Sequence, residues 1–175
     1  MPLNNVPRPV FQKAVSISLL LMFFLIGEST AQQKTAPDFT LPDLSGNMIS
    51  LKDFRGKIVF VDFWATYCVP CRKSMPELAE LERKYRDEGL VILGLSVDDP
   101  DSYDNRYVSE FKDRFEVEYP ILRADEKMMK DFLHTDEAFL PTLVIVDRDG
   151  KIVETQIGFE PGRAEKALKS LLESK

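Results

Sequence analysis

The stretch VFVDFWATYCVPCRK, residues 59–73, decides how this chain is interpreted. Its first half is apolar and rich in β-branched and aromatic residues, as in a strand buried on both faces of a sheet. The stretch continues into Cys68-x-x-Cys71, and a polar segment with helical periodicity follows. It therefore predicts a pair of thiols at the junction of a strand and a helix. A helix N-terminus stabilises a thiolate, and the thiolate is the nucleophile in thiol–disulfide exchange.

A zinc site and a purely structural disulfide both fit the cysteine pair less well. A structural zinc site needs about four ligands, but the chain has no further cysteine and a single histidine, His134. A purely structural disulfide would gain little, because so short a loop constrains the unfolded chain only slightly. The pair is therefore predicted to be redox-active, and we expect no metal and no cofactor.

The rest of the chain alternates between strand-like and helix-like segments. The expected strands are 39–41, 48–51, 58–64, 91–97, 142–146 and 152–156, and the expected helices are 71–88, one starting near Ser102, 126–133 and 163–172. Gly89 is the predicted end of the long helix, and Asp149-Gly150 indicates a hairpin turn. This order predicts an α/β protein with a central mixed β-sheet flanked by helices.

Residues 1–31 have the composition of a targeting segment. Arg8 and Lys13 precede an apolar run over 14–26, and small residues follow it, which is the pattern of a secretory signal peptide. The run is short for a membrane span of about 20 residues, and an uncleaved membrane anchor is the alternative. Residues 32–175 are then one folded domain in the periplasm or another extracytoplasmic space, where disulfides persist. The net charge of −6 gives no support for nucleic-acid binding.

Several spaced segments resemble the thioredoxin superfamily, in the order in which that superfamily carries them. VDFWA followed by Cys68-Val69-Pro70-Cys71 resembles its active-site strand and turn, and Pro76 lies where it has a proline in the active-site helix. Leu140-Pro141-Thr142 is similar to its cis-proline loop. Residues 36–46 resemble the N-terminal extension of the periplasmic TlpA/ResA-like thioredoxins, which peroxiredoxins share. The resemblance implies a thioredoxin fold with an N-terminal β-hairpin extension and a helical insertion after the second central strand.

The cysteines and their surroundings have expected roles. Cys68 comes first, at the helix start, and is expected to attack, whereas Cys71 is expected to be more buried and to resolve the mixed disulfide. Arg72 and Lys73 either add positive charge near the sulfurs or form a solvated helix face. Asp62 matches the thioredoxin residue that relays a proton to or from the resolving cysteine. A carboxylate within a buried strand is costly without a partner, and burial shifts its pKa toward values that suit proton transfer. The alternative is an Asp that faces solvent.

The resemblance also implies residues that contact the substrate. Pro141 is expected in the cis form, with the backbone of Leu140 turned toward the dithiol so that a substrate chain can pair with it as an added strand. Tyr67, where thioredoxin has Trp, and Pro70, between the cysteines, are expected to border the dithiol. Trp64 matches a second thioredoxin Trp, and it either packs in the core or contributes to the substrate-binding surface.

These features predict a thiol–disulfide oxidoreductase that reduces protein disulfides. The resemblance implies that a membrane electron donor of the DsbD/CcdA type reduces the Cys68–Cys71 disulfide again. Ser74 departs from the resemblance, because many ResA-like proteins carry an active-site Glu at this position, and the acid–base role shifts onto Asp62.

Other activities are possible for a cysteine pair in this setting. A thiol peroxidase of the peroxiredoxin type would suit the N-terminal extension, but its Pro-x-x-x-Thr-x-x-Cys pattern fails, since Thr66 lies two residues before Cys68 and residue 62 is Asp. A disulfide oxidase or isomerase would use the same cysteines at a different reduction potential. A metal chaperone of the Sco type needs a Cys-x-x-x-Cys pair and a suitable histidine. This chain has a Cys-x-x-Cys pair and a single histidine, His134, so the pattern fits poorly.

Overall fold

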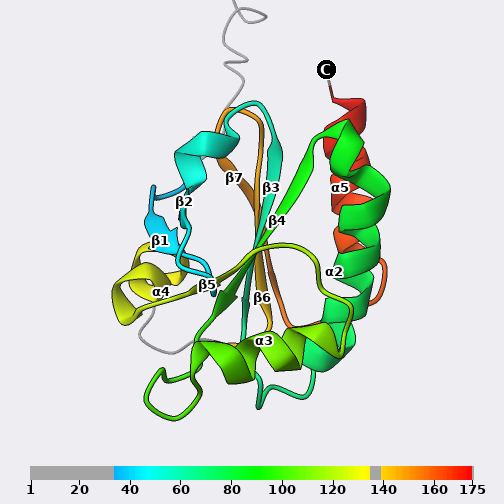
Figure 1. Cartoon of the computed structure of the whole chain (residues 1–175). Coiled ribbons are helices and arrows are strands. Elements are labelled where there is room, and N and C mark those ends of the chain that lie inside the picture. Colours follow the sequence, from blue (N-terminus) through cyan, green and yellow to red (C-terminus); the bar gives the residue numbers. More distant parts are fainter. Residues whose placement is uncertain (1–33, 135–138, 175) are drawn as a thin grey trace, which may run out of the picture. The chain divides into compact units, whose positions relative to one another are not determined.

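The computed structural model describes residues 34–134 and 139–174 (Figure 1). The predicted signal peptide or membrane anchor, residues 1–31, lies outside the described residues. The helices are α2 (Cys71–Tyr85), α3 (Asn105–Asp113), α4 (Glu126–Leu133) and α5 (Arg163–Glu173), and the 3-10 turns are η2 (Leu51–Phe54) and η3 (Arg86–Glu88). Within the described ranges, no helix is both long enough and apolar enough to span a membrane.

A five-stranded mixed sheet forms the centre of the fold (Figure 1). The strands are β3 (Ile58–Trp64), β4 (Leu90–Ser96), β5 (Ile121–Arg123), β6 (Thr142–Val146) and β7 (Ile152–Ile157), with β1 (Thr40–Pro42) and β2 (Met48–Ser50) forming a separate hairpin. The order is β5-β4-β3-β6-β7. β4 runs parallel to β3, and β6 runs antiparallel to it. Every side chain of β3 is buried, which confirms the prediction made from its apolar run.

Helices cover both faces of the sheet. On one face, Phe60 and Trp64 of β3 belong to a core shared with α2, α3 and α5. On the opposite face, Val61 and Phe63 belong to a second core with η2 and α4, against which side chains of the hairpin pack. The two cores follow the alternation of side chains along a strand. This architecture confirms the predicted mixed sheet, the flanking helices and the N-terminal hairpin.

The segment between β4 and β6 contains the expected helical insertion and one strand that the sequence does not predict. β5 has only three residues and follows Pro120, so it shows too little alternation to be identified. It pairs in parallel with β4, and the hairpin approaches it through a hydrogen bond from Leu44 N–H to the carbonyl of Ile121 (3.2 Å). α3 begins later than Ser102, because the Asp104 side chain caps it.

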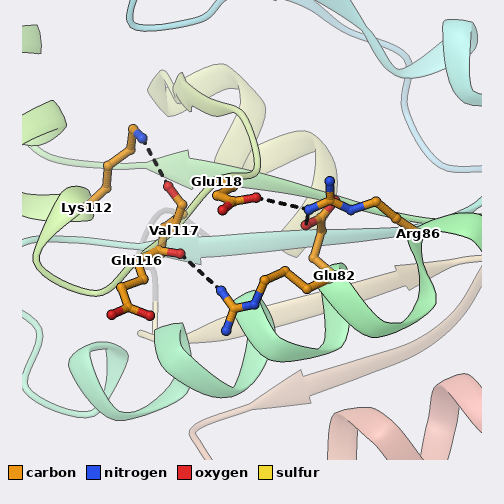
Figure 2. Close-up of polar contacts among 7 residues, drawn as sticks. Glu82, Arg86, Lys112, Glu116, Val117 and Glu118 are labelled. Atoms are coloured by element: carbon orange, nitrogen blue, oxygen red, sulfur yellow. Dashed lines mark hydrogen bonds and ion pairs between the residues drawn. The ribbon is translucent and has the colours of Figure 1, made fainter.

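The connection between α3 and β5 is fastened to α2 and to η3, which follows it; Figure 2 shows the contact with Arg86 of η3. Glu116 in this connection has a φ of 54°, in the left-handed region that residues with side chains seldom adopt. The contacts are Arg83 to the Glu116 carbonyl (3.4 Å), Arg86 to the Glu118 carboxylate (3.1 Å) and Lys112 to the Val117 carbonyl (3.0 Å). Cations from α2, η3 and α3 therefore hold the chain where it enters β5.

Candidate active site

The two cysteines form a disulfide at the start of α2. Cys68 lies in the turn after β3, and Cys71 is the first residue of the helix. Their sulfur atoms are 2.01 Å apart and their Cα atoms 5.3 Å apart. Cys68 is 7% exposed and Cys71 is fully buried. The cysteine that is predicted to attack is therefore the more accessible of the two.

The backbone around Cys68 favours a thiolate. The N–H of Cys71 donates a hydrogen bond to Cys68 Sγ over 3.1 Å. Cys71 opens α2, so this N–H belongs to the end of the helix where the dipole is positive. Both effects stabilise negative charge on sulfur more than they stabilise a neutral thiol. The geometry thus suits Cys68 as the nucleophile of thiol–disulfide exchange.

Asp62 is a buried carboxyl group that titrates near neutral pH. Its side chain lies in β3 with 1% exposure, and neither oxygen has a hydrogen-bond partner among the described residues. Burial without a partner disfavours the charged form and raises the pKa of Asp62 to about 7. The alternative of a solvent-facing Asp is therefore wrong. A carboxyl group of this acidity can accept or release a proton in the physiological range.

A small cavity lies beside Asp62. Its volume is about 20 Å³, which is the space that a single water molecule needs. Ser74 lines it from α2, one helical turn after Cys71, and its hydroxyl donates to the Cys71 carbonyl (3.0 Å). The other lining residues include Glu77, Pro141, Gln156 and Glu160. The cavity therefore offers water a place between the Asp62 carboxyl group and the first turns of the active-site helix.

The proline loop lies at the same end of the sheet as the dithiol. The Leu140–Pro141 peptide bond is cis, as predicted. β6 begins directly after it, and its first residue pairs with Phe63 near the end of β3. Because β3 leads into the cysteines, this register brings the loop to the active-site end. Pro141 is buried and lines the Asp62 cavity, whereas Leu140 is half-buried.

The surface next to Cys68 carries apolar side chains. Tyr67 and Val69 are both more than half exposed, and Pro70 is exposed as well. Trp64 does not belong to this surface: it is fully buried, and its ring stacks on Phe111 with centroids 5.8 Å apart. The core-packing alternative therefore holds for Trp64, and the expectation that it contacts substrate is corrected.

Two further residues, Thr66 and Asp98, shape the turn that carries Cys68 and were not singled out from the sequence. Asp98 is buried just after β4, and its carboxylate accepts hydrogen bonds from the N–H and the hydroxyl of Thr66. One signal was available, because an acidic residue directly after a buried strand parallel to β3 lies at the active-site edge of the sheet. Within residues 34–134 and 139–174, no three His, Cys, Asp or Glu side chains form a group that could hold a metal ion.

Comparison with known sequences agrees with this geometry. The sequence model of the AhpC/TSA family matches residues 33–155. The chain is 38% identical over 149 residues to the thiol-disulfide oxidoreductase ResA of Bacillus thuringiensis (strain Al Hakam), a match that covers 85% of this chain and 83% of the relative. It is 33% identical over 149 residues to the protein of the same name from Geobacillus kaustophilus (strain HTA426), covering 85% and 82%.

Solved structures agree in fold. A thiol:disulfide interchange protein from Bacteroides sp. has a TM-score of 0.67 and 28% identity, with 80% of this chain and 89% of that chain covered. A thioredoxin family thiol:disulfide interchange protein from Chlorobium tepidum TLS shares the fold with a TM-score of 0.72 at 22% identity, covering 82% and 99%. With its Cys68–Cys71 disulfide at the head of α2, the chain belongs to the AhpC/TSA family and is a thioredoxin-fold, ResA-type thiol-disulfide oxidoreductase.

Proposed function

We propose that this protein reduces protein disulfides outside the cytoplasm through Cys68 and Cys71. The observation that carries the proposal is the position of Cys68 Sγ, which accepts the N–H of Cys71 at a helix start. Exposed apolar side chains at Tyr67 and Val69 lie on either side of Cys68 in the chain. They offer a surface to an extended polypeptide, and we expect the backbone of Leu140 to pair with that polypeptide as an added strand.

The first step is an attack by the reduced protein. The Cys68 thiolate forms a bond to one sulfur of the substrate disulfide, and the bond between the two substrate sulfurs breaks. The other substrate sulfur leaves as a thiolate and takes up a proton. The helix start favours this step because it raises the fraction of Cys68 that is ionised.

The second step releases the reduced substrate. Cys71 gives its proton to the Asp62 carboxylate, and its sulfur attacks Cys68 Sγ. The mixed disulfide breaks, the second substrate sulfur takes up a proton, and the Cys68–Cys71 disulfide forms. Asp62 suits this role because burial raises its pKa to about 7, so that both of its forms are populated near neutral pH. Two electrons pass from the protein to the substrate, Cys71 supplies one proton through Asp62, and solvent supplies the other, because Cys68 reacts as a thiolate.

The oxidised protein needs an external reductant. We assign this role to a membrane electron donor of the DsbD/CcdA type, as the ResA-like resemblance implies. Export through residues 1–31, as a cleaved signal peptide or a retained anchor, would place the domain on the same side of the membrane. A fusion of residues 1–31 to alkaline phosphatase tests export, since the phosphatase is active only where its disulfides form. An inactive, cytoplasmic fusion would contradict it.

The direction of catalysis is tested by two measurements. The protein should reduce insulin disulfides in the presence of dithiothreitol, and a Cys68→Ser variant should not. Its reduction potential should lie near that of thioredoxin, about −270 mV, rather than near that of DsbA, about −120 mV. A potential close to the DsbA value would contradict a reductase and indicate that the protein forms disulfides in its substrates.

A further inference from the structure

Thr66, two residues before Cys68, has its polar groups bound to charged side chains. Its N–H donates to both oxygens of the Asp98 carboxylate (3.0 and 3.1 Å), and its hydroxyl donates to one of them (2.8 Å). Its carbonyl accepts from Nε (3.2 Å) and from a terminal nitrogen (2.8 Å) of the Arg72 guanidinium. Thr66 is 2% exposed. Hydrogen bonds to charged groups are stronger than those between neutral groups, so the Thr66 backbone is firmly located.

The two anchors of Thr66 come from different parts of the fold. Asp98 follows β4 and is itself held by a hydrogen bond from the Ser96 hydroxyl (2.9 Å). Arg72 is in the first turn of α2, and its guanidinium lies over the ring of Phe111 in α3, 5.7 Å from the centroid. A planar guanidinium can make a forked hydrogen bond and stack on an aromatic ring at the same time. Asp98, which follows β4, and Arg72 of α2 therefore bind the two peptide units that flank the Cα atom of Thr66.

The Arg72–Thr66 contact closes a ring around the dithiol. Residues 66–72 connect the two partners, and both Cys68 and Cys71 lie within that segment. The disulfide is a shorter link inside the same ring. Reduction breaks the link between the sulfurs, but it changes none of the atoms that join Thr66 to Arg72 and Asp98.

We infer that Arg72 and Asp98 are positioning residues that hold Thr66, and through it Cys68 Sγ, beside the N–H of Cys71 when the disulfide is open. The inference rests on disulfide exchange at Cys68 and Cys71, and it holds for either direction of electron flow. The held geometry would keep Cys68 ionised for attack and would leave it within reach of Cys71 for resolution. Neither anchor touches the substrate in this role.

Arg72 could affect Cys68 by holding Thr66 in position or by its positive charge alone, and the two effects predict different results for variants. If Arg72 acted by charge alone, the neighbouring Lys73 would contribute in the same way. The Lys73 side chain is exposed and forms no hydrogen bond or ion pair within the described part of the chain. A change at Thr66 that removes its hydroxyl alters no charge at all, yet it removes one of the bonds to Asp98. Lys73→Gln and Thr66→Val therefore separate the two effects.

The experiment measures the reduced full-length protein. The pKa of the Cys68 thiol is read from the pH dependence of its alkylation by iodoacetamide, and resolution is followed as the release of glutathione from a Cys68–glutathione mixed disulfide. Arg72→Gln and Thr66→Val should each raise the pKa of Cys68 by up to about one unit and slow resolution by about tenfold, since each loses a hydrogen bond to a charged group. Lys73→Gln and Thr66→Ser should stay close to the wild type.

Equal effects of Arg72→Gln and Lys73→Gln, with no effect of Thr66→Val, would overturn the inference and leave charge as the cause. Full retention of both properties in Arg72→Lys would also overturn it, because lysine keeps the charge and loses the fork. Should Arg72→Gln fail to fold, as near-ultraviolet circular dichroism would show, the pair Thr66→Val and Thr66→Ser decides. Because glutathione is the probe, an error in the proposed physiological substrate or direction would leave these results unchanged.

Discussion

Replacing Asp62 with Asn should stabilise the oxidised protein at alkaline pH and much less in acid. Burial raises the pKa of Asp62 from 3.8 to about 7. Because the folded pKa lies above the unfolded one, the folded protein binds the proton more tightly, and the free energy of unfolding falls as the pH rises between these values. At about 1.36 kcal/mol per pKa unit, complete ionisation costs roughly 4 kcal/mol above this window. Asn carries no charge and removes this cost.

Guanidinium unfolding of the oxidised wild type and of Asp62→Asn, near pH 5 and near pH 9, measures the effect. The difference in unfolding free energy between the two proteins should widen by about 3 kcal/mol from pH 5 to pH 9, because pH 5 already lies above the unfolded pKa and part of the cost is present there. Asp98→Asn is a matched control, since it makes the same change at a buried carboxylate that accepts hydrogen bonds from Thr66 and Ser96. It should lower stability by about 1–3 kcal/mol. Parallel pH curves for wild type and Asp62→Asn would refute the reasoning.

The same variant tests the role of Asp62 in the reaction. Stopped-flow measurement of the rate at which a model disulfide is reduced, repeated across pH, should show slower resolution by Cys71 in Asp62→Asn. The first attack by Cys68 should change less, because the helix start stabilises that thiolate. Identical profiles for both proteins would mean that the proton of Cys71 leaves by another route.

Three further predictions concern the cysteines, the reaction class and the core. Cys71→Ser should trap mixed disulfides with substrates, and limited alkylation of the reduced wild type should label Cys68 first; preferential labelling of Cys71 would reverse the two roles. Hydrogen peroxide turnover should be slow beside insulin reduction, because the peroxidase pattern is absent, and fast turnover would contradict a reductase. Gly94→Ala should lower stability by about 1–3 kcal/mol, since its Cβ would lie 2.4 Å from Ile121 Cδ1 and 3.1 Å from Trp64 Nε1; an unchanged unfolding midpoint would show that the core repacks freely.

Features that depend on neighbouring residues could be predicted from the sequence. The mostly apolar run of β3 and the helical period of α2 indicate burial directly, because each strand or helix presents its side chains at a fixed spacing. Gly89 ends the helical segment as expected, with a φ of 98° that suits a residue without a side chain. The place of Cys68 and Cys71 at the start of α2 could be predicted for the same reason, since a strand runs into a helix there.

Features that depend on distant residues could not be predicted from the sequence. β5 is too short to show a period, and the burial of Trp64 depends on Phe111, which arrives from α3. The raised pKa of Asp62 requires that no donor reaches it, which a local sequence pattern does not reveal. Such properties depend on which elements pack together.

By itself, the sequence determined the dithiol, its strand-to-helix setting and the candidate cis-proline loop, because these are local patterns that the backbone expresses wherever the segment lies. Only the tertiary structure decided what surrounds the dithiol. The register of β3 with β6 brings Pro141 to the active-site end of the sheet, although it lies far from the cysteines in the chain. The parallel pairing of β3 with β4 places Asp98 against Thr66 across 32 positions of sequence. Such contacts arise from strand order and burial, and no spacing within either segment encodes them.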